Sequence, residues 1–389
     1  MNIDAELKQI EQRICTLTSE QFEMPACQNL HSSCKDTMET VVNQALTSSK
    51  GGKRLRALLS LLSYDAAIST ISSNKNSNKS SSNTSENSSN SNENTSENSN
   101  ESFNRASMID LACAIEVFQT AALIHDDIID ESSLRRGIPS AYCAFSKVYN
   151  NLHIGTGLGI MLGDLLAAES FNIAGNCAKN LKNTQELLTT FSDTQRNVCV
   201  GQVLDISIEM MDLDNTELLA QSSLNVFKWK TASYTTISPI KLGFLSAGLD
   251  PKLANDLAYS IGEPLGIAFQ LADDLLDVVS DPKHTGKPVG GDIREGKRAT
   301  LLADALQNSN EKDKAYLKKA YTKKHRSSGD VKRIIDIFYK SGAIEKSKKR
   351  IKDLWEQSQQ ALQNSELSEE AKNIMQSIIE RFIPEQWRI

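Results

Sequence analysis

Apolar residues recur at spacings of three and four along most of the chain. This spacing places them on one face of an α-helix. The segments with this pattern are Ala106 to Ile129, Leu152 to Ala174, Thr184 to Met211, Leu301 to Ala320, Asp330 to Phe338, Gly342 to Gln363 and Ser368 to Phe382. No run of alternating β-branched residues indicates a sheet. The pattern therefore predicts an all-α fold.

A further predicted helix begins at Asp250-Pro251, because Asp is a good cap and Pro is accepted in the first turn. It runs towards Ser280 and is expected to bend at Pro264. The segment from Asp281 to Lys297 is rich in Gly, Pro and Lys and is predicted to be a loop. Two of the predicted helices are almost continuously apolar, so we expect them at the centre of one large helical bundle. This bundle is a single domain over residues 1–389 with a central cavity.

The segment from Ser72 to Ser102 differs from the rest of the chain. Its 31 residues are Ser, Asn, Thr, Glu and Lys, without a single apolar side chain. Such a stretch cannot bury enough surface to offset the entropy lost on ordering. We predict a disordered insert at residues 72–102 within the domain.

Composition excludes several classes of protein. The chain has 389 residues, and its 43 basic and 49 acidic side chains give a net charge of −6, which does not suit nucleic acid. Seven cysteines without CxxC or Cys/His spacing indicate reduced thiols. The polar start lacks a secretory signal, and we find no apolar stretch of about 18 residues, so no transmembrane segment is expected. These features together predict a cytoplasmic protein.

Aspartates gather at the ends of the two apolar helices. In each cluster the third Asp lies four residues after the first, which predicts that all three project from one side of one turn. Like charges in one turn repel by roughly 0.2–0.5 kcal/mol per pair, and a helix C-terminus disfavours negative charge. Oxygen ligands alone suit Mg²⁺, which would relieve this repulsion; the alternative is a pair of solvated acidic helix ends. The two clusters are Asp126, Asp127 and Asp130, and Asp273, Asp274 and Asp277.

Basic residues lie at helix starts and in breaks of the helical pattern. Arg and Lys in such places, with backbone N–H groups, are suited to diphosphate. Taken singly, each is more often a solvated surface charge. His125 precedes the first acidic cluster and points about 100° away from it, so we interpret it as structural. The basic positions are Lys53, Arg54 and Arg56 after Gly51-Gly52, Arg135-Arg136, Lys230 beside Thr231, Lys287 and Lys297.

In order and spacing, these motifs resemble those of the trans-type polyprenyl diphosphate synthases, the family of farnesyl and geranylgeranyl diphosphate synthases. The resemblance runs from about Gly51 to Thr300 and skips the polar insert. Two features depart from it. Ala57 stands where family members often have Pro after the Arg that corresponds to Arg56, and the chain ends in Trp387-Arg388-Ile389 without the basic tail that some members use to cover the site. The matching motifs are Gly52-Lys53-Arg54-x-Arg56, Asp126-Asp127-x-x-Asp130 with Arg135-Arg136-Gly137, Gly201-Gln202 with Asp205, Lys230-Thr231, Phe269-Gln270 before Asp273-Asp274-x-x-Asp277, and Gly286-Lys287 with Gly291-Asp292 and Lys297.

The resemblance implies a helical bundle of the isoprenoid synthase type, a homodimer, and three Mg²⁺ ions with bound diphosphate. It also implies a role for each matching residue. Asp126, Asp130 and Asp273 would bind Mg²⁺ directly. Asp127, Asp274 and Asp277 would complete the shells of ligands around the ions. Isopentenyl diphosphate would be bound by Lys53, Arg56, Arg136 and Gln119, and the allylic diphosphate by Arg135, Lys230, Thr231, Gln270, Lys287 and Lys297. The catalytic set would be Asp126, Asp130, Asp273, Lys230 and Arg135.

The residues upstream of Asp126 predict the product length. Ala122, Ala121 and Phe118 stand four, five and eight positions before it and form a column below the expected metal site. Family members that stop at C15 commonly carry aromatic rings at the first two positions. Here two alanines leave that layer open, and Phe118 lies one turn, about 5 Å, deeper, which favours C20. The alternative for Phe118 is ordinary core packing.

The implied reaction is the head-to-tail condensation of isopentenyl diphosphate with an allylic diphosphate. The allylic diphosphate ionises, the cation joins the isopentenyl double bond in a dry pocket, and a proton is lost. The product is expected to be geranylgeranyl diphosphate, with farnesyl or longer products as alternatives. Rival functions are a class I terpene cyclase, whose second metal motif usually differs, and a non-catalytic subunit, which should have lost motif residues. A purely structural bundle leaves both acidic clusters unexplained.

Overall fold

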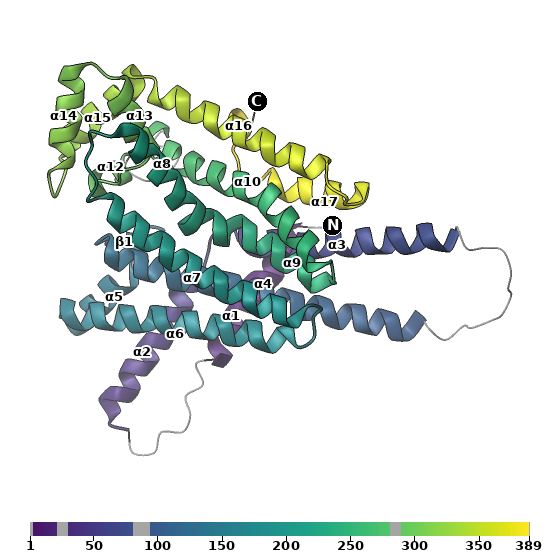
Figure 1. The fold of residues 1–389 in the computed structure, drawn as a ribbon. Coiled ribbons are helices and arrows are strands. Elements are labelled where there is room, and N and C mark those ends of the chain that lie inside the picture. Colours follow the sequence, from purple (N-terminus) through teal and green to yellow (C-terminus); the bar gives the residue numbers. More distant parts are fainter. Residues whose placement is uncertain (1–2, 22–29, 81–93, 281–288, 389) are drawn as a thin grey trace, which may run out of the picture. The chain divides into compact units, whose positions relative to one another are not determined.

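The computed structural model describes residues 3–21, 30–80, 94–280 and 289–388 of the chain. Regular structure in these ranges is almost entirely helical (Figure 1), which confirms the all-α prediction. The chain divides into two compact units: unit 1 comprises residues 1–192 and 242–251, and unit 2 comprises residues 193–241 and 252–389. The single domain over 1–389 therefore stays a prediction.

Unit 1 is built around the long helix α4. Helices α1, α2, α3, α5 and α6 all pack against it. Its apolar half is buried on nearly every side, with Leu111, Ala112 and Ala114 almost inaccessible, as expected for a helix that is hydrophobic all round. The elements are α1 (Ile3–Gln21), α2 (Ser32–Ser49), α3 (Leu55–Ser80), α4 (Asn94–Ile129), β1 (Leu134–Arg135), β2 (Ile138–Pro139), α5 (Ala141–Tyr149) and α6 (Leu152–Ala178).

Unit 2 has α10 and α13 in its core. Helix α13 packs against α8, α14, α15 and α16. Helix α10 runs through Pro264 and approaches η1 closely at Gly262 and Gly266, where a Cβ would meet η1 atoms within about 3 Å. The elements that lie wholly or partly in this unit are α7 (Thr184–Ile208), α8 (Thr216–Val226), η1 (Phe227–Ile237), α9 (Ser238–Ala247), α10 (Pro251–Val279), α12 (Gly291–Glu295), α13 (Thr300–Asn308), α14 (Glu311–Tyr321), α15 (Ser328–Lys340), α16 (Ala343–Gln363), α17 (Glu369–Ile379) and η2 (Glu385–Trp387).

Local structure corrects the sequence-based expectations in three places. A two-stranded antiparallel hairpin, β1–β2, is present although no sheet is expected; its turn at Arg136-Gly137 has two left-handed residues, the geometry that closes tight hairpins. The short helix α12 lies within the predicted loop from Asp281 to Lys297. The helix predicted from Leu301 to Ala320 is two helices, because the Asn310 side chain caps a new one, α14.

The backbone is helical at both ends of the polar insert, and the disordered insert at residues 72–102 stays a prediction. Helix α3 continues to Ser80 and α4 begins at Asn94, so the backbone is helical in residues 72–80 and 94–102. Extending an existing helix adds one hydrogen bond for each residue that is ordered, and needs no new nucleus. The apolar, packed part of each helix can therefore stabilise helical backbone in the polar residues that adjoin it. Residues 81–93 lie outside the described residues.

Two described helices are long and apolar enough to cross a membrane by length and composition alone. Residues 105–129 form the first, and 78% of its most apolar window is buried inside the chain, as in the core helix of a soluble protein. Residues 152–178 form the second, and only 33% of its window is buried. The sequence predicts both as helices, but neither as a transmembrane candidate, because scattered polar residues interrupt the apolar runs. The absence of a transmembrane segment therefore stays a prediction.

Glycines bring α6 close to its neighbours in unit 1. A Cβ at Gly155 would lie 2.5 Å from the backbone nitrogen of Ser146 on α5, and one at Gly163 would lie 2.2 Å from Nε2 of His125 on α4. The inner side of α6 therefore needs glycine for this close approach. The six cysteines in the described residues carry free thiols, as predicted, and Cys27 lies outside them.

Candidate active site

The first acidic motif ends α4 in unit 1. Asp126 and Asp130 are partly accessible, whereas Asp127 is only 2% exposed. Asp127 is therefore the buried member of this cluster, and projection of all three carboxylates from one side stays a prediction. Successive helical residues are about 100° apart, so Asp127 faces the protein while Asp126 and Asp130, four apart, share a face.

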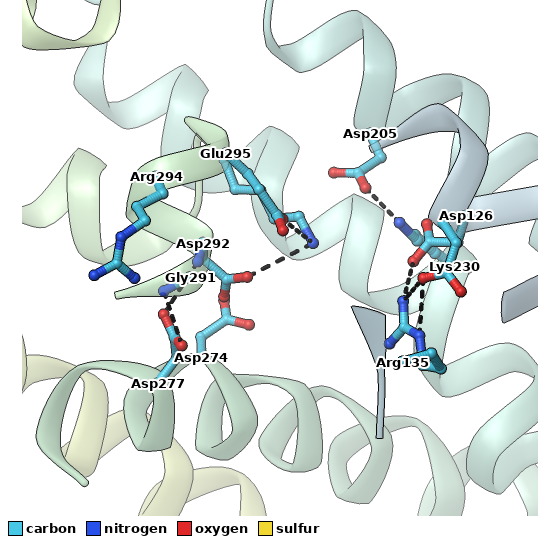
Figure 2. Close-up of polar contacts among 12 residues, drawn as sticks. Asp126, Arg135, Asp205, Lys230, Asp274, Asp277, Gly291, Asp292, Arg294 and Glu295 are labelled. Atoms are coloured by element: carbon cyan, nitrogen blue, oxygen red, sulfur yellow. Dashed lines mark hydrogen bonds and ion pairs between the residues drawn. The ribbon is translucent and has the colours of Figure 1, made fainter. Parts of the chain in front are cut away.

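Arg135 on β1 compensates the buried carboxylate (Figure 2). Its Nε donates to Asp127 Oδ1 at 2.9 Å, its Nη2 contacts the same oxygen, and Nη2 lies 4.0 Å from Asp126 Oδ2. Burial raises the pKa of Asp127, against the lowering effect of Arg135. The β1–β2 hairpin thus brings a cation to the acidic end of α4 within the same unit.

The basic motif between α2 and α3 is a tight loop. Gly51, Gly52 and Arg54 have left-handed backbones, with φ of 75°, 107° and 50°. This path exposes the carbonyls of Lys50 and Gly51, which accept hydrogen bonds from Arg136 Nη1 at 2.6 and 2.9 Å. Burial and then the charge of Arg54 lower the pKa of Arg136, so positive charge is concentrated here. An anion would be attracted to this loop.

Gln119 on α4 lies against this basic loop. Its amide oxygen accepts from Arg56 Nη1 at 2.9 Å when its nitrogen faces Glu116. Arg56 is largely buried at the start of α3, whereas Lys53 is exposed. Four residues predicted to bind isopentenyl diphosphate, namely Lys53, Arg56, Gln119 and Arg136, thus come from neighbouring segments of unit 1.

The predicted chain-length residues lie on the buried part of α4. Phe118 is 6% exposed and Ala121 is 1% exposed, while Ala122 is partly accessible. The small side chains thus lie nearer the acidic motif and the large ring lies farther from it, as the sequence predicts. Burial of Phe118 suits both a pocket floor and core packing, so its role stays a prediction.

His125 contributes to packing between α4 and α6. Its Nε2 lies 3.1 Å from the carbonyl oxygen of Ile160 and 3.4 Å from Asp164 Oδ1. These contacts, together with Gly163 close by, account for the imidazole without a chemical role. They agree with its interpretation as structural.

In unit 2, Lys230 and Thr231 lie in a π-helix, η1. Such wide turns are rare, and they often occur at functional sites. Gly201 on α7 allows the backbone of Lys230 to come close, since a Cβ there would be 2.2 Å from the Lys230 nitrogen. Lys230 Nζ bonds Asp205 Oδ2 on α7 at 2.5 Å (Figure 2).

A chain of hydrogen bonds joins η1 to the second acidic motif. Thr231 Oγ1 donates to Gln270 Oε1 at 2.8 Å, and Gln270 Nε2 donates to Asp274 Oδ1 at 2.8 Å. Asp274 is buried, whereas Asp273 on the same turn is exposed. Burial and then the charge of Asp292 raise the pKa of Asp274 well above its usual value, and Gln270 opposes this shift.

Asp277, the third acid of this motif, holds the start of α12 (Figure 2). Its two oxygens accept from the backbone N–H groups of Gly291 and Asp292, each at 3.1 Å. Burial and then Asp292 raise the pKa of Asp277 to about 6, although these N–H groups lower it. Lys297 Nζ approaches Asp292 at 3.6 Å and Glu295 at 3.4 Å. Asp277 therefore positions the loop that carries Asp292 and Lys297.

These groups open onto a cavity of about 110 Å³ within unit 2. Predicted site residues contribute six of its lining side chains, and the lining includes three further charged residues, Asp205, Asp292 and Arg298. The resemblance includes Asp205 and Asp292 in its motifs without assigning them roles, and Arg298 is distinguished only as the neighbour of Lys297. Lys287 lies outside the described residues. The six predicted residues are Lys230, Thr231, Gln270, Asp273, Asp274 and Lys297.

The donor set around this cavity suits a hard cation. The charge of Asp292 raises the pKa of both Asp274 and Asp277, and a nearby cation would relieve this repulsion. Among the described residues, no three His, Cys, Asp or Glu side chains form a complete metal site by themselves. Mg²⁺ does not need such a cage, because it is usually held by one or two carboxylates with water and phosphate oxygens.

Comparison with known proteins decides the family. The sequence profile of the Polyprenyl synthetase family matches residues 36–338. The chain belongs to this family. It is 34% identical to the geranylgeranyl diphosphate synthase of Sulfolobus acidocaldarius over 233 residues, which cover 58% of this chain and 65% of that protein. It is also 34% identical to the short chain isoprenyl diphosphate synthase of Methanothermobacter thermautotrophicus over 238 residues, 60% of this chain and 67% of that protein.

A solved structure supports the same family. The geranylgeranyl pyrophosphate synthase of Corynebacterium glutamicum, complexed with isoprenyl diphosphate and magnesium, is 29% identical with a TM-score of 0.76. The comparison covers 98% of this chain and 99% of that one. The resemblance to polyprenyl synthases and the isoprenoid synthase type of fold are thus confirmed. In sequence, this polyprenyl synthetase spans about two thirds of the length of the two archaeal relatives.

The raised pKa of Asp277 predicts a pH dependence of stability. A carboxylate whose pKa rises on folding favours the native state below its unfolded value, near pH 4, and loses this contribution as pH rises through about 6. Without Mg²⁺, we compare the melting temperature of Asp277→Asn with that of the parent at each pH. The difference, variant minus parent, should be more positive at pH 7 than at pH 4.5, by roughly 2–4 °C. Differential scanning calorimetry of both proteins at both pH values measures this.

Asp256→Asn on the same helix is the control. Its hydrogen bond with Lys252 lowers the pKa of Asp256. The melting-temperature change caused by Asp256→Asn should therefore be equal at the two pH values or more negative at pH 7 than at pH 4.5. An equal response of the two variants would contradict the assignment to Asp277.

Proposed function

We propose that this polyprenyl synthetase is a Mg²⁺-dependent head-to-tail prenyltransferase of the EC 2.5.1 class. It condenses isopentenyl diphosphate with an allylic diphosphate and makes geranylgeranyl diphosphate. The single observation that carries the proposal is the polar cavity of unit 2, which gathers two lysines, a threonine, a glutamine and two motif aspartates. Such a set combines groups for a diphosphate with carboxylates for its metal ions. A cytoplasmic location stays a prediction.

Carboxylates of both motifs are proposed to bind Mg²⁺. Asp126 and Asp130 are accessible and share a helix face, and Asp273 is exposed at the cavity, which supports direct binding by these three. Asp127 and Asp277 are already bonded to Arg135 and to backbone N–H groups, so we assign them positioning roles, and buried Asp274 completes a shell. When bound, Mg²⁺ would neutralise the negative charge that develops on the diphosphate as the C–O bond of the allylic substrate breaks. Three ions are proposed, from the resemblance.

The basic residues are proposed to bind the two substrates. In unit 2, Lys230 and Lys297 are each paired with carboxylates, and an incoming diphosphate can replace those partners. Thr231 and Gln270 are held in place by their mutual hydrogen bond. The roles of Arg135 and Lys287 towards the same diphosphate, and of Lys53, Arg56, Arg136 and Gln119 towards isopentenyl diphosphate, are proposed from the resemblance.

The apolar side chains of α4 protect the reactive carbon. Ionisation of an allylic diphosphate leaves a carbocation, which must meet the isopentenyl double bond before water does. The electron pair of that double bond forms the new C–C bond, and loss of a proton restores a double bond. We propose that the departing diphosphate accepts this proton, because His125 is engaged with Ile160 and Asp164.

Removing a metal-binding carboxylate tests the activity. Purified Asp126→Ala, given Mg²⁺, isopentenyl diphosphate and a C5, C10 or C15 primer, should lose at least about 100-fold in turnover, since metal stabilisation supplies several kcal/mol. Its melting temperature without metal should be unchanged or slightly higher, because like-charge repulsion is relieved. Asp336→Ala, exposed on α15, is the control and should stay within about two-fold of the parent.

Other outcomes identify the rival functions. A hydrocarbon product without elongation would indicate a cyclase, and folded parent protein that elongates no primer would indicate a partner-dependent subunit. Full activity in folded Asp126→Ala would overturn the metal-binding role of the motif.

Product length tests Phe118 as the floor. The parent should make a C20 product, consistent with the names of the Sulfolobus and Corynebacterium relatives and with the alanines at 121 and 122. Phe118→Ala should shift the product to C25 or longer, because the deeper layer opens. Chromatography of the dephosphorylated alcohols measures the length. Ala122→Phe is the paired variant and should shorten the product towards C15; unchanged lengths in both variants would assign Phe118 to core packing.

We further propose that the outer side of α6 forms a homodimer interface. This side carries Ile154, Met161, Leu165 and Phe171, all at least 36% exposed, while its opposite side is buried in unit 1. A helix that is apolar all round is normally covered. Two-fold pairing of identical faces is the commonest way to cover such a surface, and the family resemblance implies a homodimer.

A charge on this face should separate the subunits. Met161→Glu, with a 52% exposed parent side chain, should give a monomer at micromolar concentration, because two carboxylates would be desolvated about the two-fold axis. Sedimentation equilibrium measures the mass. Met210→Glu, from a 78% exposed methionine, is the control and should leave the dimer intact. A monomeric parent, or equal dissociation of both variants, would contradict this interface.

A further inference from the structure

Glu116 is a buried acid on α4 that the reaction described above does not use. Its side chain is about 2% exposed. Oε1 accepts the backbone N–H of Ala57 at 3.2 Å, and Oε2 accepts from Arg54 Nη1 at 3.2 Å and from the Gln119 amide nitrogen at 3.1 Å. A carboxylate is stable in such a place only when donors surround it, so these three contacts belong together.

The amide of Gln119 has one orientation that suits both of its neighbours. Its nitrogen donates to Glu116, and its oxygen accepts from Arg56 Nη1 at 2.9 Å. The opposite orientation would set oxygen against carboxylate and nitrogen against guanidinium. The acceptor at Glu116 thus determines which end of the amide faces Arg56.

Arg54 balances the charge of Glu116. Its guanidinium is 1% exposed and bonds Glu116, Glu11 Oε2 at 2.7 Å, and the carbonyl oxygen of Ser49. The neutral amide of Gln119 separates the carboxylate from Arg56. The contact of this network with the Arg56 guanidinium is therefore made through a neutral amide oxygen, which fixes the direction of Nη1.

We propose that Glu116 is a positioning residue for isopentenyl diphosphate. It acts through Gln119, which orients the guanidinium of Arg56, while Arg54 keeps the buried carboxylate compensated. The inference rests on the proposed function, because it assumes that Arg56 and Gln119 bind this substrate.

Steady-state kinetics of the full-length enzyme with Glu116→Gln test the inference. The new amide cannot accept from all three donors, so Gln119 loses its fixed orientation. The KM for isopentenyl diphosphate should rise at least ten-fold, as expected from losing the alignment of a charged hydrogen bond. The KM for the allylic substrate should stay within about two-fold. A merely structural role would not separate the two KM values in this way.

Glu11→Gln is the matched control. It removes the other carboxylate partner of Arg54, at 2.7 Å, and has no contact with Gln119 in the network described above. It should lower the melting temperature and leave the KM for isopentenyl diphosphate unchanged. In a Gln119→Ala background, Glu116→Gln should raise that KM less than about two-fold further, because its intermediary is already absent.

The outcomes separate this inference from the proposed function. An active parent whose KM for isopentenyl diphosphate is unchanged in Glu116→Gln, or rises equally in Glu11→Gln, overturns the inference alone. A folded parent that condenses no substrates overturns the proposed function, and the inference with it. If Glu116→Gln does not fold, Glu116→Asp replaces it: this variant keeps the charge beside Arg54 but withdraws the carboxylate, and the same KM criteria apply.

Discussion

Repulsion among carboxylates is the constraint on which the rest of this structure depends. Both acidic motifs place negative charge at a helix C-terminus, where the backbone dipole already disfavours it. In unit 1 the buried acids have guanidinium partners: Arg135 for Asp127 and Arg54 for Glu116. In unit 2 the compensation is weaker, because Asp274 has an amide partner and Asp277 has backbone N–H groups. The charge of Lys297 lowers the pKa of Asp274, but burial and Asp292 outweigh it.

This difference explains the pKa shifts in unit 2. Burial raises the pKa of Asp274 and Asp277, and the charge of Asp292 raises both further. A cation among these groups would lower the repulsion between Asp292 and the two motif acids. The lysines at the cavity, Lys230 and Lys297, meanwhile pair with acids that a diphosphate can replace. In the proposed function these acids and lysines would bind ligands of both signs.

Unusual backbone conformations place much of the remaining site. Left-handed residues at Arg54 and Arg136 are disfavoured by roughly 1–2 kcal/mol each, and their side chains form hydrogen bonds that hold them there. The π-helix η1 likewise sets Lys230 and Thr231 against α7 and α10. These segments are held by contacts with other elements, so their conformation is a property of the folded unit.

Periodicity and short motifs alone determined the all-α class, most helix positions, the family and the two acidic clusters. These features depend on local spacing, which is written directly in the order of residues. The hairpin and α12 were missed, because turn geometry and capping by Asp277 depend on neighbouring structure.

Only the tertiary structure distinguished the roles within each motif. Spacing treats Asp126 and Asp127 alike, yet burial and Arg135 set Asp127 apart. It also could not show that Glu116 and Gln119 meet Arg54 and Arg56, which are about sixty positions away in the chain. Burial and long-range contacts depend on which surfaces pack together, and a residue's own neighbours in sequence do not specify this.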